Sequence, residues 1–164
     1  AYLITRERRY DTAALASAEI GVVFTSLGLI TGPLWAKPAW GVFWTWDARL
    51  TTALVLWLIY VSYLMLRRYV PDDVKRANLA AVAGIIGFVD VPIVHFSIRW
   101  WRTQHPQPVI MGGSDSGLHP LMFHALMMSL TAFFFLFVWL LERRVAIEQA
   151  RHEVEHLHKQ VEGL

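Results

Sequence analysis

Four apolar stretches, each close to the length that crosses a lipid bilayer, constrain the fold of this chain most. They lie at about residues 13–33, 50–66, 79–98 and 121–141. Roughly 20 apolar residues in a helix cross about 30 Å of hydrocarbon, and a helix satisfies its backbone hydrogen bonds within itself. Because 55% of the 164 residues are hydrophobic, little chain is left for a soluble domain. We therefore expect an all-α, polytopic membrane protein with four transmembrane helices.

The amino-acid composition excludes some kinds of site and partner for this chain. The chain has no cysteine, which excludes disulfides and thiolate metal sites. Its formal net charge is +2, but the basic residues bracket the apolar stretches and form no stripe or arm. We expect contact with a lipid bilayer and no binding of nucleic acid.

Lysine and arginine predict the orientation in the membrane, because cytoplasmic segments carry the excess of these residues. Segments 1–12, 67–78 and 142–164 hold eleven of the fifteen, whereas the alternate segments hold only Lys37, Arg49, Arg99 and Arg102. Both termini are therefore expected in the cytoplasm, and segments 34–50 and 98–120 on the outer face. Residue 1 is Ala and no signal-peptide pattern follows it, so we expect the natural chain to begin further upstream.

Prolines, glycines and an aspartate predict where the helices end. Gly32-Pro33 and Lys37-Pro38 are expected to end the first span, because proline cannot continue a helix without losing a hydrogen bond. Asp47 is placed to cap the second span, and Pro71-Asp72-Asp73 should form a turn. The second outer loop is too rich in helix breakers for a regular helix throughout; these are Pro106, Pro108, Gly112, Gly113 and Gly117.

Tryptophans gather in the two segments expected on the outer face. Six of the eight tryptophans lie there, namely Trp35, Trp40, Trp44, Trp46, Trp100 and Trp101. Indole rings are common where hydrocarbon meets headgroups, so an interfacial belt is one interpretation. The alternative is a binding surface for a flat apolar ligand.

Histidines near the same face favour the second interpretation. They are His95, His105, His119 and His124. Zinc or di-iron sites need more acids or thiols than this region offers. Haem fits better, because indoles can cover the macrocycle, a histidine can hold iron, and Arg49, Arg99 or Arg102 can meet the propionates. Asp90 lies inside the third span, where a structural role and a role at the site remain equally open; for Glu19 a structural role is favoured.

Three motifs now give the chain a family resemblance. They are Trp40-Gly41-Val42-Phe43-Trp44-Thr45-Trp46-Asp47-Ala48-Arg49-Leu50-Thr51, Asp90-Val91-Pro92-Ile93-Val94-His95-Phe96-Ser97 and Arg99-Trp100-Trp101-Arg102-Thr103-Gln104-His105. Together they resemble the haem-handling family with the tryptophan-rich "WWD" signature, and specifically its cytochrome c maturation protein C (CcmC) branch. The resemblance covers roughly residues 13–141.

The resemblance implies a function and a setting. It implies a multi-pass protein of the bacterial inner membrane that binds b-type haem transiently at its outer, periplasmic face and delivers it to the haem chaperone CcmE. It also implies the small subunit CcmD and the transporter subunits CcmA and CcmB as partners. Members have six spans, so the four found here would be the last four.

The same resemblance implies roles for single residues. His105 matches an axial ligand of the haem iron, while Trp40, Trp44, Trp46 and Asp47 match the tryptophan motif. Phe43 departs from the usual tryptophan, which keeps a ring but loses an N–H donor. We add Arg49, Trp100, Trp101 and His95 as candidate haem contacts. The second axial histidine would lie in an earlier loop, so no residue of this chain can be named for it.

Two alternatives for the function stay open, a haem lyase acting directly on c-type apocytochrome and a structural subunit of a transport complex. No catalytic residue is predicted, since no nucleophile or acid–base pair is evident, and any activity would resemble that of a haem-chaperone lyase. A haem absorption spectrum would distinguish the structural subunit from the other two.

The chain divides into an N-terminal segment, 1–12, a transmembrane haem-handling domain, 13–141, and a C-terminal amphipathic helix, 142–164. The last of these carries a heptad seam, in which β-branched residues alternate with mostly leucine; it comprises Ile147, Ala150, Val154, Leu157, Val161 and Leu164. The seam is shorter than three heptads. A pairing helix, a helix lying on the membrane surface, and a helix ordered only in a complex remain possible. His152, His156 and His158 lie away from the seam and are expected to be solvated.

Overall fold

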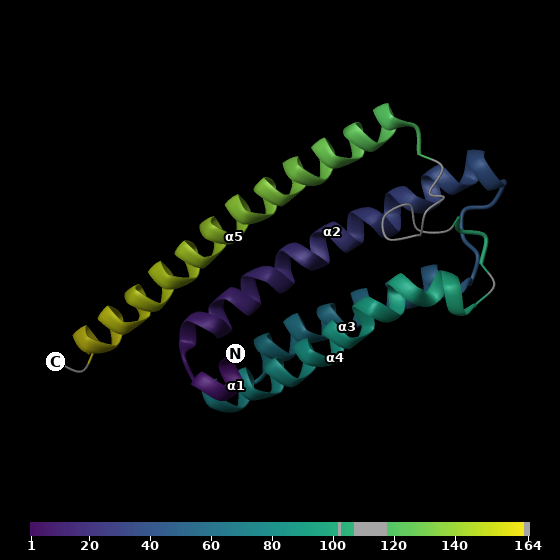
Figure 1. The fold of residues 1–164 in the computed structure, drawn as a ribbon. Helices are drawn as coiled ribbons and strands as arrows, with labels where there is room; N and C mark the ends of the chain where they lie inside the picture. Colours follow the sequence, from purple (N-terminus) through teal and green to yellow (C-terminus); the bar gives the residue numbers. More distant parts are fainter. Residues whose placement is uncertain (102, 107–117, 163–164) are drawn as a thin grey trace.

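A computed structural model describes residues 1–101, 103–106 and 118–162, except for the side chains of residues 155, 156, 159 and 162. These residues form a short helix α1 (Tyr2–Thr5) and four long ones, and they contain no strand (Figure 1). The long helices are α2 (Arg8–Trp40), α3 (Ala48–Tyr69), α4 (Asp73–Trp100) and α5 (Pro120–Glu162). Each is long and apolar enough to cross a membrane. The prediction of four spans in an all-α protein is confirmed.

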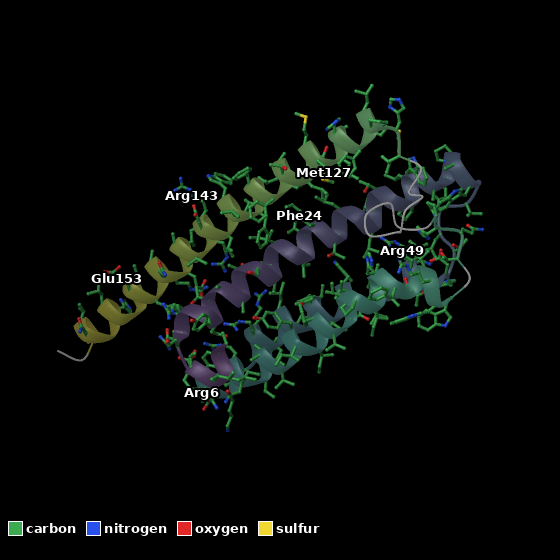
Figure 2. The ribbon with its side chains drawn as sticks, viewed as in Figure 1. Arg6, Phe24, Arg49, Met127, Arg143 and Glu153 are labelled. Carbon is green, nitrogen blue, oxygen red and sulfur yellow. The ribbon has the colours of Figure 1, made fainter. Side chains whose placement is uncertain are left out.

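The long helices are arranged around α2. Helices α3 and α4 form a closely packed pair, α2 packs on α3, and α5 lies along the other side of α2 (Figure 1). The helix ends and their connections form two groups, one at each end of the bundle. The α2–α3 connection, Trp101 and residues 103–106 lie at one end, which we call the loop end, whereas α1 and the α3–α4 connection lie at the opposite end. Figure 2 shows Arg49 near the loop end and Arg6 near the opposite one.

Small residues allow the helices of the α3–α4 pair to approach closely. Ala80 of α4 is buried against Tyr63 of α3. A β-carbon placed on Gly87 would lie 2.8 Å from the Tyr60 ring, whereas one on Gly84 would have 3.8 Å to Tyr63. Membrane helices use small residues in this way, because van der Waals packing replaces the hydrophobic effect between them.

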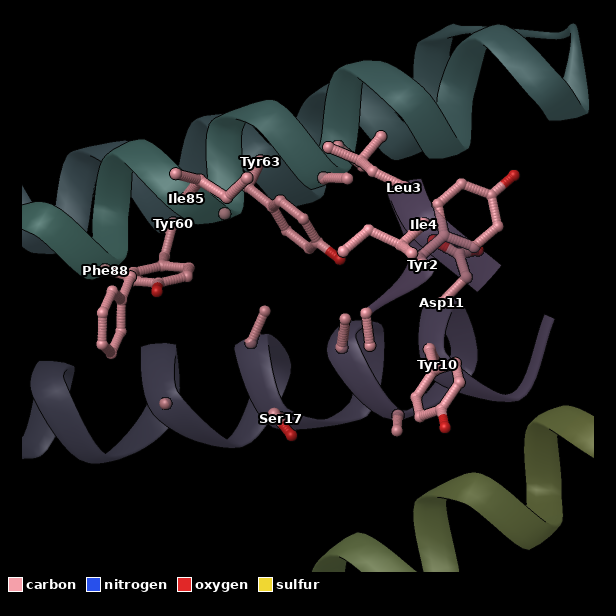
Figure 3. Close-up of a pocket in the computed structure, with 18 of the residues that line it drawn as sticks. Tyr2, Leu3, Ile4, Tyr10, Asp11, Ser17, Tyr60, Tyr63, Ile85 and Phe88 are labelled. Atoms are coloured by element: carbon pink, nitrogen blue, oxygen red, sulfur yellow. The ribbon is translucent and has the colours of Figure 1, made fainter. Parts of the chain in front are cut away.

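An apolar cavity of about 830 Å³ lies between α2 and the α3–α4 pair (Figure 3). Tyr60, Tyr63, Ile85 and Phe88 form one wall, and small residues of α2 such as Ser17 form the other. Residues of α1 line the end of this cavity that is remote from the loop end. The Tyr60 ring therefore has open space on one side and Gly87 on the other.

The outer surface of the helices is apolar. Aromatic side chains of α5 such as Phe134, Phe135 and Trp139 are more than half exposed, as are Ile86 and Phe88 of α4. In water such a surface would be costly, whereas in a bilayer it contacts lipid tails. The protein is a multi-pass membrane protein.

The prediction that prolines end the first span is wrong. Helix α2 continues through Pro33 and Pro38 to Trp40. Proline removes one helix hydrogen bond and clashes with the carbonyl four residues earlier, but membrane helices tolerate this cost. Gly32 before Pro33 also lacks the β-carbon that would add a further clash. Helix α2 ends instead at Gly41, whose φ of 80° is left-handed and whose N–H donates to the Lys37 carbonyl over 2.9 Å.

The cap predicted at Asp47 is confirmed, whereas of the turn predicted at Pro71-Asp72-Asp73 only Pro71 and Asp72 lie outside the helices. Asp47 caps α3 by accepting the Leu50 N–H over 2.8 Å. Asp72 caps α4 in the same way, accepting the Lys75 N–H over 2.7 Å. Of the breaker-rich loop, residues 101, 103–106, 118 and 119 are not helical; Pro108, Gly112, Gly113 and Gly117 lie outside the described residues.

Partly buried ion pairs connect α2 to α3 and to α5 away from the loop end. Arg67 of α3 makes two hydrogen bonds to the Asp11 carboxylate, of 2.6 and 2.7 Å. Arg144 of α5 donates to Glu19 over 2.9 Å and to Glu148 over 2.7 Å. Glu19 thus has the structural role that was favoured for it. Asp90 is buried in α4, and its Oδ2 atom has no hydrogen-bond partner within the described part of the chain.

Helix α5 runs without interruption across the expected boundary between residues 141 and 142. The C-terminal segment therefore continues the last span in the same direction as one uninterrupted helix. Leu164, the last position of the heptad seam, lies outside the described residues.

Candidate functional site

Asp47 is the centre of a hydrogen-bonded cluster at the loop end. Asp47 is the N-cap of α3, and one of its carboxylate oxygens accepts the Leu50 N–H. The cap holds the side chain in position. The second oxygen, Oδ2, accepts from the Thr103 hydroxyl over 2.7 Å and lies 2.8 Å from His105 Nδ1. One side chain thus joins the start of α3 to the segment that follows α4.

The charge of Asp47 is stabilised. Burial by itself would raise the pKa of this carboxyl group, but the hydrogen bonds from the Leu50 N–H, Thr103 and His105 outweigh burial and leave the pKa below its ordinary value. The stabilisation is therefore fully present at neutral pH and is lost only as the pH falls through this lowered pKa.

Asp47 determines the tautomer of His105. An ionised carboxylate has no proton to donate, so the Nδ1 atom of His105 must carry the hydrogen of their shared bond. In the neutral imidazole the lone pair then lies on Nε2, the other ring nitrogen. A carboxylate bonded to one ring nitrogen commonly orients a histidine that binds a metal through the other.

Thr103 holds the backbone of His105 in place. Its hydroxyl oxygen accepts the His105 N–H over 3.2 Å while its proton goes to Asp47. No role for Thr103 was predicted from its residue type or position. The signal was the threonine two residues before the histidine, a spacing at which a side-chain oxygen commonly bonds the backbone in loops.

Aromatic rings surround the Asp47–His105 pair. The Trp40 ring meets the His105 ring edge to face with centroids 5.1 Å apart, and Trp35 contacts Trp40 at 5.2 Å. Trp44 and Trp46 contact each other at 5.6 Å, again edge to face. Trp46 is 75% exposed, so part of this aromatic surface is free of contacts with the described residues.

A shallow hollow of about 440 Å³ lies beside the cluster. Its walls are Thr45, Trp46, Asp47, Thr103 and Gln104. Nearby, the Trp44 Nε1–H is buried with no acceptor among the residues that the structure describes. A buried N–H donor is costly to leave unpaired, so this group would favour a ligand that brings an acceptor.

The remaining predicted residues lie on several different elements of the fold. Arg49 is in the first turn of α3. Trp100 ends α4 and stacks on Phe96, and Trp101 follows with its ring 5.8 Å from that of Trp100. His95 lies within α4, where its ring contacts Phe96. His119 precedes α5 and accepts the Leu121 N–H over 3.3 Å.

The donor set suits one kind of metal group. Within residues 1–101, 103–106 and 118–162, no group of three or more histidine and acidic side chains could enclose a metal ion. A single oriented imidazole among indoles would instead suit a metal that a macrocycle already holds, to which the imidazole could supply one further bond.

Comparison with known proteins shows the family to which the chain belongs. The family model described as "Heme exporter protein C" matches residues 1–160. Heme exporter protein C of Bradyrhizobium diazoefficiens is 40% identical over 155 residues, which are 94% of this chain and 59% of that protein. The protein of the same name from Haemophilus influenzae is 34% identical over 153 residues, 93% of this chain and 62% of that protein.

The Escherichia coli K12 relative, of the same name, is 42% identical over 103 residues, 63% of this chain and 42% of that protein. The fold and the loop-end cluster define a polytopic helical membrane protein with a single oriented imidazole in an aromatic setting. Within that class the chain belongs to the heme exporter protein C (CcmC) family. It spans about three fifths of the length of the first two relatives named here.

Proposed function

We propose that this chain handles haem in cytochrome c maturation, binding it at the loop end through His105. The observation that carries the proposal is the hydrogen bond between Asp47 Oδ2 and His105 Nδ1. It leaves a lone pair on Nε2, and iron binds a ring nitrogen through such a lone pair. Membership of the heme exporter protein C family supports the identity of the ligand.

The surroundings of His105 fit a porphyrin. Trp40 contacts the imidazole, and the exposed Trp46, Trp100 and Trp101 offer flat apolar faces at the same end of the bundle. Haem also carries two propionates, which seek donors and positive charge. The buried Trp44 N–H and the Arg49 guanidinium in the first turn of α3 are candidates for that contact. Haem held by one imidazole bond and open indole faces would be b-type and transiently bound.

The role of this site would be to transfer haem to another protein. We propose that the loop end faces the periplasm across the bacterial inner membrane, that both chain ends described here face the cytoplasm, and that haem passes from this site to the chaperone CcmE. CcmD, CcmA and CcmB would assemble with residues 13–141, which form the haem-handling domain. The excess of lysine and arginine away from the loop end supports this orientation.

A haem titration of the Trp40→Ala, Trp44→Ala, Trp46→Ala triple variant tests the platform. We expect haem affinity to fall by about 1–3 kcal/mol for each well-packed ring, with membrane insertion retained. Trp139→Ala removes an exposed indole from α5 and is the matched control, which should bind haem normally. Equal haem content in the two variants would show that the rings form only an interfacial belt.

Transfer and orientation are tested separately. Covalent loading of CcmE in cells should stop with the triple variant and continue with Trp139→Ala. A reporter fused after Leu164 should stay in the cytoplasm, while one inserted at Gly112 should be exported. The reverse labelling would contradict the proposed outer face. If the unsubstituted chain bound no haem, it would instead be a structural subunit.

A further inference from the structure

The C-terminal half of α5 presents an apolar seam that no other described part of the chain covers. A 43-residue helix is about 65 Å long, and crossing the hydrocarbon uses about 30 Å of it. The rest projects from the membrane as a single rod. Ile147, Val154, Leu157 and Val161 are each more than half exposed there.

The contacts of α5 hold this seam away from the protein. Arg144 bonds Glu19 of α2 and Glu148 one turn on, and Glu148 lies 3.7 Å from His152. These three α5 residues follow each other at intervals of four, so they form one face of the helix. At 100° per residue the seam lies roughly 140° around the helix from that face. The ion pairs that attach α5 to α2 therefore leave the seam free to pair.

We propose that residues 147–161 form a parallel two-stranded coiled coil with the same segment of a second copy of this chain. In heptad terms, Ile147, Val154 and Val161 occupy position a, and Ala150 and Leu157 occupy position d. β-Branched residues at a with leucine at d favour a parallel pair. The membrane imposes the same direction, because every copy inserts with one orientation and α5 leaves the same face in each.

Charge at the flanking positions agrees with a second copy as the occupant. In a parallel pair, position g faces position e of the next heptad in the other helix. That register brings Glu153 opposite His158 of the second copy, and Ala146 opposite its Arg151. No like charges oppose each other. The seam is short, but anchoring both helices in one bilayer raises their effective concentration, which compensates for a small contact area.

Cysteine cross-linking of the full chain in native membranes tests this pairing, because the sequence has no cysteine of its own. We expect mild oxidation to convert Val154→Cys and Leu157→Cys to disulfide dimers at least five-fold more efficiently than Gln149→Cys. Gln149 is also exposed but lies outside the seam. Equal yields at all three positions, or a cross-link to a protein of another mass, would overturn the proposal.

A second test places the cysteine at the start of the seam and changes the residues at its centre, so it does not depend on thiols there. Adding Val154→Asp and Leu157→Asp to an Ile147→Cys chain should remove its cross-link, whereas adding Gln149→Asp, which lies at position c, should preserve it. The haem spectrum should stay unchanged in both, because the loop end is not altered. A persistent cross-link after the seam substitutions would contradict the coiled coil without bearing on the haem site.

Discussion

Asp47 and His105 are 58 positions apart in the sequence, yet 2.8 Å separates the Oδ2 atom of one from the Nδ1 atom of the other. The same carboxylate caps α3 through its second oxygen. The start of a transmembrane helix and the orientation of an imidazole therefore depend on one side chain. This arrangement gives the acidic residue of the tryptophan motif a definite physical task, which is to direct the lone pair of His105 away from itself.

The Asp47→Asn variant separates the two tasks of this side chain. Asparagine is as good an N-cap as aspartate, so α3 should start normally and membrane insertion should not change. The neutral amide no longer fixes the tautomer of His105 by charge, and losing such a partner typically weakens metal binding 10–100-fold. Haem titration should show this loss. Asp72→Asn, which changes the equivalent cap of α4, should bind haem like the original chain.

The Arg67–Asp11 pair should contribute more to stability than the surface pairs. The two side chains are only 10% and 19% exposed, against 71% and 59% for Arg8 and Asp73. Arg67→Met leaves a largely buried carboxylate without its partner, which should cost about 3 kcal/mol. Arg8→Met should cost well under 1 kcal/mol, because exposed pairs are weak. Thermal unfolding in detergent measures both, and equal shifts in melting temperature would contradict the assignment.

Gly87 should tolerate alanine less well than Gly84. A β-carbon at 87 would lie 2.8 Å from the Tyr60 ring, so that ring would have to swing toward the neighbouring cavity, at a cost of about 1–3 kcal/mol. At 84 the nearest atom is 3.8 Å away, and alanine should be neutral or slightly stabilising in the helix. Adding Tyr60→Leu should restore the stability of Gly87→Ala. A Gly87→Ala chain as stable as Gly84→Ala would show that the ring moves freely.

Much of the fold could be predicted because membrane spans obey a strict length and composition rule. The four spans and the cap at Asp47 followed from local sequence alone. The end of α2 did not, because the cost of a proline depends on the residue before it and on the position in the helix. Gly32 removes one part of that cost at Pro33, and α2 ends only where Gly41 adopts a left-handed conformation.

The site was predictable residue by residue but not as an arrangement. His105 and Asp47 each stood out by type and motif, yet nothing local indicates that they share a hydrogen bond across 58 positions. Thr103 was missed because its spacing from His105 indicates only a bond to the loop backbone, whereas its second partner, Asp47, lies 56 positions away. The structure likewise supplies partners for Glu19 that sequence spacing could not, since Arg144 lies 125 positions away.

The absorption spectrum of haem bound to the His105→Ala chain tests the central claim most directly. Removing the imidazole should abolish the axial-ligand bands, while insertion into the membrane stays normal and His124→Ala keeps the original spectrum. Added imidazole should restore the bands by occupying the vacated position, without necessarily restoring transfer to CcmE. An unchanged haem spectrum in His105→Ala, with loss of the bands in His95→Ala instead, would contradict the assignment of His105 as the iron ligand.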